Sequence, residues 1–191
     1  MWVLSASQCY QPTVWIRLGE VNITISKGTE QFIVPDKVFR HRNYNSRNLD
    51  NDIMLIKLAS ELTLNSKVKA LSLPTDCAAP GTSCLISGGG NNPSSGANMA
   101  HLPKCRNAPI LTATQCRKDY QGEITDNMNC IGCLENDKDY CQAASGTPVV
   151  CNGELQGIVS RGHGQALKNA IIAYTKVCHY MDWISSIIAA N

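Results

Sequence analysis

The sequence Pro148-Val149-Val150-Cys151-Asn152-Gly153-Glu154-Leu155-Gln156-Gly157-Ile158-Val159-Ser160 contains two short apolar runs, 148–151 and 155–160, with turn-forming residues between them. Similar short runs recur along the chain, at residues 14–18, 31–34, 53–58, 70–73, 84–87 and 170–174. The segment Gly88-Gly89-Gly90-Asn91-Asn92-Pro93 is one of the breaks between them. Many short strands separated by Gly, Asn and Pro predict an all-β barrel or sandwich.

The last dozen residues have a different pattern. Their large apolar side chains are spaced at i, i+3, i+4, i+7 and i+8: Tyr180, Trp183, Ile184, Ile187 and Ile188. This spacing places them on one face of an amphipathic helix. We therefore predict an all-β body with a C-terminal helix docked on it.

Composition excludes several classes of protein. The chain has 191 residues with 43% hydrophobic residues, so it is neither disordered nor too short for a core of its own. Its 17 basic and 15 acidic side chains leave a net charge of +2, which gives no general reason to expect nucleic acid or an anionic membrane as a partner. No apolar run reaches the roughly 18 residues that a transmembrane helix needs.

Ten cysteines indicate a disulfide-bonded protein of an oxidising compartment. Zinc binding is the alternative, but Cys130-Ile131-Gly132-Cys133 is the single C-x-x-C, and the four histidines are scattered. Residues 1–9 lack the basic region and the long apolar stretch of a signal peptide. We interpret the chain as the mature part of a secreted protein whose beginning is missing.

Three segments contain residues suited to nucleophilic chemistry. Residues 141–151 place Ser145 in a turn of small residues before a strand, and Asp52 stands at the mouth of the buried run 53–58. Residues 2–9 run from an apolar strand into Gln8, beside Cys9. Taken singly, each has an ordinary structural explanation, since serines form turns and aspartates cap strands.

Together these segments resemble the trypsin family of serine endopeptidases, and within it the pancreatic trypsins. The resemblance extends over essentially the whole chain and is most specific at residues 17–20, 30–33, 51–58, 84–88, 138–139, 149–157 and 174–177. It implies an all-β, trypsin-like double β-barrel with a C-terminal helix and the active site between the barrels. The first barrel is expected to be incomplete, within a single peptidase domain divided into residues 1–75, 76–178 and 179–190.

The resemblance also implies peptide-bond hydrolysis by serine, histidine and aspartate, and here the sequence departs from the family. Ser145 matches the nucleophile and Asp52 the carboxylate that orients the histidine, but Gln8 stands where the family has the histidine. A glutamine has no group that titrates near neutrality, so it cannot take the serine proton or return it to the leaving amine.

Two further catalytic features differ from the family. The family's Gly-Asp-Ser-Gly-Gly reads Ala143-Ala144-Ser145-Gly146-Thr147. Ala143 and Ser145 are the expected oxyanion donors, and a Cβ at Ala143 is expected to disfavour the required backbone geometry. Ala144 replaces the aspartate that pairs with the new α-amino group after zymogen cleavage.

The substrate pocket combines matching and altered residues. Asp139 matches the carboxylate that attracts Arg and Lys side chains, and Gly162 matches one open wall. The opposite glycine aligns with Ile172, whose side chain would fill the slot, and Arg161 is placed to neutralise Asp139. We favour a closed, neutralised pocket over a working one.

The segment that corresponds to the family's calcium-binding loop matches some ligand positions but also carries a basic residue. Glu20 and Glu30 match ligands that bind through side chains, and Asn22 and Ile25 match ligands that bind through backbone carbonyls. Lys27 adds a positive charge where a hard cation requires oxygens. We expect no cofactor, with weak calcium binding as the alternative.

Family analogy also implies a disulfide pairing, namely Cys77–Cys178, Cys84–Cys151 and Cys116–Cys130. It leaves Cys9 and Cys105 without their usual partners, together with Cys133 and Cys141, which either bridge each other or stay free. Free thiols at Cys9 or Cys105 could link the chain to a partner.

The leading hypothesis is therefore a trypsin-like endopeptidase homologue that is catalytically inactive. Two alternatives remain: a binding module that uses the scaffold for partner contacts, and an endopeptidase with residual cleavage after Arg or Lys of a polypeptide. By family resemblance the protein is extracellular.

Overall fold

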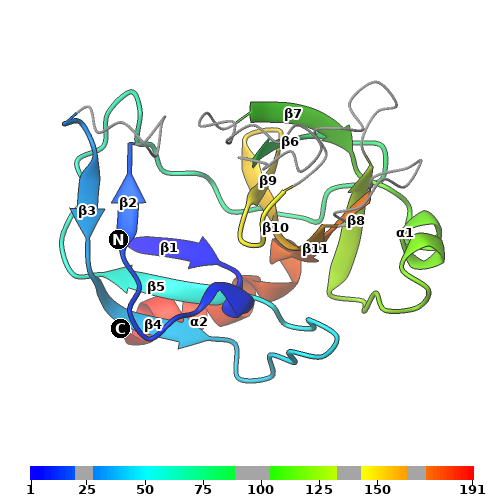
Figure 1. Ribbon diagram of the computed structural model, residues 1–191, viewed down its shortest axis with the longest axis horizontal. Coiled ribbons are helices and arrows are strands. Elements are labelled where there is room, and N and C mark those ends of the chain that lie inside the picture. Colours follow the sequence, from blue (N-terminus) through cyan, green and yellow to red (C-terminus); the bar gives the residue numbers. More distant parts are fainter. Residues whose placement is uncertain (20–27, 89–103, 133–142, 163–170) are drawn as a thin grey trace, which may run out of the picture.

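The chain folds into an all-β body with a helix at its C-terminus, as a computed structural model shows (Figure 1). The structure describes residues 1–19, 28–88, 104–132, 143–162 and 171–191. Residues 2–58 form two small sheets, and residues 83–176 form one six-stranded sheet. The predicted fold class is confirmed.

The six-stranded sheet has the order β7-β6-β9-β10-β11-β8, with every neighbouring pair antiparallel. Its strands are β6 (Ser83–Gly88), β7 (Lys104–Pro109), β8 (Met128–Gly132), β9 (Pro148–Cys151), β10 (Glu154–Gly162) and β11 (Ile171–Lys176). Immediately after β7, Ile110 pairs with Ile131 of β8 in an isolated bridge that nearly joins the two edges of the sheet. The sheet is therefore almost a closed barrel.

The turn between β9 and β10 follows directly from its sequence. Asn152 and Gly153 both have positive φ, at 51° and 77°, and they connect the paired residues Cys151 and Glu154. A two-residue hairpin loop with positive φ at both positions favours Asn-Gly, because that backbone twist matches the twist of the strands. This turn fixes the register of the two central strands that carry the site described below.

The N-terminal part contains a three-stranded sheet in the order β1-β5-β4 and a two-stranded sheet of β2 and β3. These strands are β1 (Trp2–Ser5), β2 (Ile16–Leu18), β3 (Gln31–Ile33), β4 (Pro35–Arg40) and β5 (Met54–Leu58). A short 3-10 helix, η1 (Ser7–Cys9), follows β1. Among the described residues, these five strands do not form one continuous sheet.

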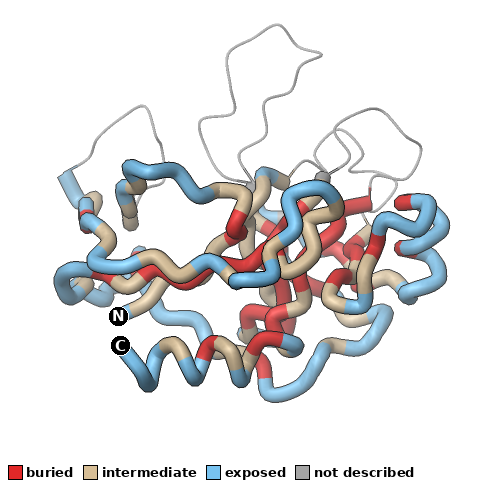
Figure 2. Tube along the Cα trace, turned by 90° about the horizontal axis from the view of Figure 1, so that it is seen from below, coloured by how far each residue is buried: buried red, intermediate tan, exposed pale blue. Residues whose placement is uncertain are grey.

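The C-terminal helix α2 (Met181–Ala190) follows the 3-10 turn η3 (Val177–Tyr180) and packs across both parts of the molecule. Its Ile184 is buried in one cluster with Ile53 and Leu55 from the first part and Ile158 from β10. Figure 2 shows this buried layer running through the interior, with the outer side of the helix exposed. Ile188, predicted on the buried face, is 39% exposed, because the contact ends with Ile187.

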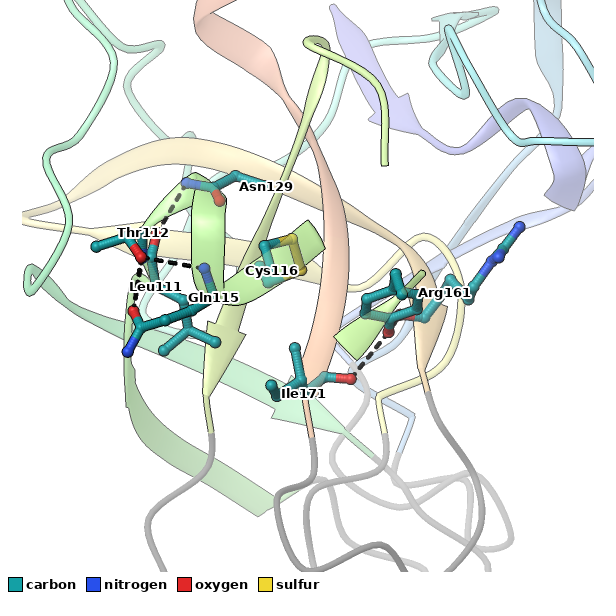
Figure 3. The surroundings of a disulfide bond; sticks show 9 residues. Leu111, Thr112, Gln115, Cys116, Asn129, Arg161 and Ile171 are labelled. Atoms are coloured by element: carbon teal, nitrogen blue, oxygen red, sulfur yellow. Dashed lines mark hydrogen bonds between the residues drawn. A yellow bond between two sulfur atoms is a disulfide. The ribbon is translucent and has the colours of Figure 1, made fainter. Parts of the chain in front are cut away.

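Two other sequence expectations differ from the structure. Residues 70–73 form no strand, since only Ser72 makes a single bridge, to Glu154, and Leu71 is exposed. The helix α1 (Ala113–Asp119) was not anticipated, although Thr112 and Gln115 form a capping box at its start. Figure 3 shows that box beside Cys116, whose disulfide to Cys130 ties α1 to β8.

Candidate active site

The side chain of Gln8 is fixed against Asp52 and β10. Its backbone N–H donates to Asp52 Oδ1 at 2.9 Å, and its Nε2 donates to Asp52 Oδ2 at 2.6 Å. The same Nε2 donates to the backbone oxygen of Ser160 at 2.6 Å. Two acceptors around one nitrogen fix the orientation of the amide, so Gln8 presents donors here.

Asp52 is fully buried two residues before β5, with 0% exposure. Both of its carboxylate oxygens accept hydrogen bonds from Gln8, and its backbone oxygen accepts one from Thr175 Oγ1 at 3.1 Å. Ser7 Oγ donates to Ile53 O at 2.7 Å and thereby holds η1 against the start of the same strand. The buried carboxylate of Asp52 therefore receives its hydrogen bonds from the neutral backbone and side-chain amides of Gln8.

Ser145 lies in the turn that precedes β9, half-buried, and its Oγ donates to Ser160 O at 3.3 Å. The Ser160 carbonyl therefore receives both Gln8 and Ser145. The turn is held by the N–H of Thr147, which donates to Ala144 O at 3.1 Å, and by the N–H of Gly146, which donates to Val159 O at 2.8 Å. The predicted residues Gln8, Asp52 and Ser145 are thus brought to one place.

Gly146 is required for two reasons. Its φ of +88° lies in the left-handed region, and a Cβ there would approach Ser5 Oγ to 3.0 Å and Cys9 Sγ to 3.2 Å. The φ of Ala143, in contrast, is not positive. The described non-glycine residues with positive φ are Leu49, Asn51, Gln121 and Asn152. The methyl group of Ala143 packs against the core cluster of the six-stranded sheet.

Ile172 occupies the centre of that core. It pairs with Gly162 across β10 and β11, is 0% exposed, and shares a cluster with Val149 and Val159. Arg161 makes an ion pair with Glu123, and its guanidinium lies 6.0 Å from the ring centre of Tyr120. Figure 3 shows Arg161 and Ile171 on adjacent strands. Asp139 lies outside the described residues.

Of the predicted calcium ligands, only Glu30 lies among the described residues; it is half-buried just before β3. Glu20, Asn22 and Ile25 lie outside them. The structure contains the three disulfides Cys77–Cys178, Cys84–Cys151 and Cys116–Cys130. Cys77, Cys178 and His179 come close enough together to bind a metal, but both sulfurs are used in the disulfide. Cys133 and Cys141 are outside the described residues.

Cys9 and Cys105 are free thiols in very different surroundings. Cys9 is half-buried and donates to Ser145 O at 3.3 Å, and its pKa is raised by burial and by the nearby Asp52 charge. Cys105 is exposed on β7.

We expect iodoacetamide to modify Cys105 of the native protein about tenfold faster than Cys9 at pH 8, because the thiolate is the reactive form. Peptide mass spectrometry over a time course measures both rates. In guanidinium the two rates should converge, and a faster reaction at Cys9 in the native protein would contradict a half-buried thiol with a raised pKa.

The carbonyl of Ser160 was not predicted as part of the site. A backbone oxygen has no sequence signal of its own. The register of β10 against β11, which shifts between Val159 and Arg161, places the Ser160 carbonyl between Gln8 and Ser145. Thr175 was also missed; its hydroxyl lies 2.8 Å from Ser160 Oγ.

Comparisons with known proteins find similarity over almost the whole chain. The trypsin family model matches residues 1–184. An anionic trypsin of Canis lupus familiaris is 60% identical over 190 residues, covering 100% of this chain and 77% of the relative. A trypsin of Xenopus laevis is 58% identical over 190 residues, covering 100% of this chain and 78% of the relative. A trypsin of Sus scrofa is 56% identical over 190 residues, covering 100% of this chain and 82% of the relative. In the part of the chain that the structure describes, no helix is long and apolar enough to cross a membrane.

Proposed function

Because this chain belongs to the trypsin family of serine proteases, we propose that it is a trypsin homologue that retains the protease scaffold without catalysing peptide hydrolysis. The observation that carries the proposal is the amide of Gln8, hydrogen-bonded to Asp52 and to Ser160 O where a general base would have to act. An amide accepts no proton near neutrality.

The serine hydroxyl has no base within the described site. Ser145 Oγ gives its hydrogen to the carbonyl of Ser160, which is not basic either, and Gln8 presents its Nε2 donor on the same carbonyl. Without proton transfer the hydroxyl remains a weak nucleophile at neutral pH. Loss of one member of a triad lowers the rate by roughly 10⁴–10⁶-fold.

The surroundings of the serine support the same proposal. Ala143 and Ala144 carry methyl groups where the family has a glycine and an aspartate, and neither supplies a carboxylate for an activating amino group. The side chain of Ile172, fully buried beside Gly162, would fill the slot for an Arg or Lys side chain, and the described partner of Arg161 is Glu123. We infer that the substrate pocket is closed.

We also propose an extracellular location, on the family membership and the three disulfides. A polypeptide-binding module is the second candidate. It is favoured by the exposed free thiol of Cys105, which leaves a position for a disulfide-linked partner.

A biotinylated arginyl diphenyl phosphonate, which labels activated serines, tests the proposal directly. We expect no label on Ser145 after prolonged incubation, whereas pig trypsin treated alongside should be labelled completely. A Ser145→Ala variant controls for nonspecific attachment. Labelling that depends on Ser145 would overturn the proposal in favour of residual endopeptidase activity.

A further inference from the structure

A stacked arginine lies beside the candidate site. The Arg40 guanidinium carbon is 5.1 Å from the ring centre of Tyr10 and 5.1 Å from that of Tyr44. Arg40 ends β4, where its backbone pairs with Met54 of β5, so the stack stands on a strand rather than on a loose loop. Aromatic faces at this distance attract a guanidinium and restrict its motion.

The stack adjoins Gln8 and Asp52. Tyr10 follows η1 directly, and its N–H donates to Ser7 O at 3.2 Å. Burial, and after it the nearby Asp52 charge, raises the pKa of the Tyr44 phenol. The guanidinium is therefore placed at the border of the site and does not belong to the hydrogen-bonded group of Gln8, Asp52 and Ser145.

The positive charge around Arg40 is not balanced by an ion pair among the described residues, although the buried Asp52 lies near Tyr44. Residues 40–47, Arg-His-Arg-Asn-Tyr-Asn-Ser-Arg, contain three arginines and no acidic residue. Among the described residues, Arg40, Arg42 and Arg47 form no ion pair. The next acidic residues accept hydrogen bonds from neutral groups: Asp50 from Thr125 and Asn127, and the buried Asp52 from Gln8.

A groove continues from the stack, and its lining combines apolar side chains with the polar residues Gln11, Thr13, Asp36 and Lys37. It is lined by residues 10–15 and 34–38 and shares Tyr10 with it. Trp15 and Val34 on the groove are 65% and 50% exposed. A ligand that fits both features carries a carboxylate next to apolar side chains, as an acidic peptide does and a sulfated polysaccharide does not.

We propose that Arg40, held by Tyr10 and Tyr44, is a recognition site for the carboxylate of an acidic peptide whose apolar residues lie in the groove of residues 10–15 and 34–38. A planar guanidinium pairs with a carboxylate through two parallel hydrogen bonds. The proposal does not depend on the loss of catalysis, because none of these residues takes part in proton transfer.

Fluorescence anisotropy with a labelled Gly-Glu-Leu-Val-Gly peptide, and with its glutamine counterpart, tests this assignment. We expect the glutamate peptide to bind more tightly and Arg40→Gln to weaken its binding about tenfold or more, the usual scale of a charge-assisted pair. Arg40→Lys keeps the charge but loses the fork, so it should weaken binding severalfold. Arg117→Gln on α1 removes an equal charge elsewhere and should change little.

Four results would overturn the proposal: equal binding of the two peptides, wild-type binding by Arg40→Gln, no binding of the glutamate peptide at about 1 mM, or binding of heparin with none of the peptide. Circular dichroism of each variant verifies that it is folded. The phosphonate test addresses catalysis separately, so failure of one proposal leaves the other intact.

Discussion

The Gln8→His variant should hydrolyse a lysyl or arginyl amide at a rate still roughly 10⁴-fold below that of pig trypsin assayed alongside. The new imidazole would lie against Asp52, which is buried and already oriented toward position 8. A base alone is insufficient, because Ala143, Ala144 and Ile172 remain and a stabilised oxyanion and an open pocket are separate requirements.

Turnover of a chromogenic amide, followed over days with active-site titration, measures this rate. Gln8→Ala is the matched control and should be indistinguishable from the unmodified chain, since both lack a base. Near-UV circular dichroism verifies that Gln8→His retains its fold. If Gln8→His cleaves the amide within about a hundredfold of pig trypsin, then the alanines and the isoleucine do not impair the site and our account of inactivity fails.

Much of the fold was predictable because it depends on short apolar runs and turn residues. The runs at 148–151 and 155–160 became β9 and β10, and Asn152-Gly153 supplied the turn that their pairing needs. The run at 70–73 failed because an apolar stretch becomes a strand only where a neighbour has open hydrogen-bonding groups. There, Ser72 makes a single bridge to Glu154, in which the N–H of Leu155 donates to Ser72 O at 2.9 Å. The sequence signal for α1 was the capping box of Thr112 and Gln115. It is a pair of polar side chains, and a search for apolar periodicity does not detect it.

The site was predictable in part, for a different reason. Gln8, Asp52 and Ser145 were singled out by resemblance, since no spacing in one dimension shows that residues 8, 52 and 145 meet. The Ser160 carbonyl depends on strand register and could not be read from residue types. Arg161 was expected to pair with Asp139, which lies outside the described residues. Among the described residues, Arg161 forms an ion pair with Glu123. Glu123 follows α1, a helix that was not predicted from the sequence.

Removing the Cys84–Cys151 disulfide should be among the most destabilising changes in this protein. Both cysteines are 1% exposed in the core cluster that contains Ile172 and Tyr174, and their bond joins β6 to β9. It closes a loop with a sequence separation of 67. The chain-entropy relation for a loop of that length gives about 4 kcal/mol, within the usual range of about 2–5 kcal/mol for a native disulfide.

We therefore expect Cys84→Ala/Cys151→Ala to lower the free energy of unfolding by about 4 kcal/mol, and by more if the cavity left by the sulfurs does not collapse. Urea titration followed by tryptophan fluorescence measures the change. Cys105→Ala is the matched control: it removes an exposed free thiol, and a shift within about 0.5 kcal/mol is expected. A loss below about 1 kcal/mol for the double variant would mean that the chain folds nearly as well without the disulfide. In that case hydrogen bonding between β6 and β9, and not the covalent link, would hold this side of the barrel.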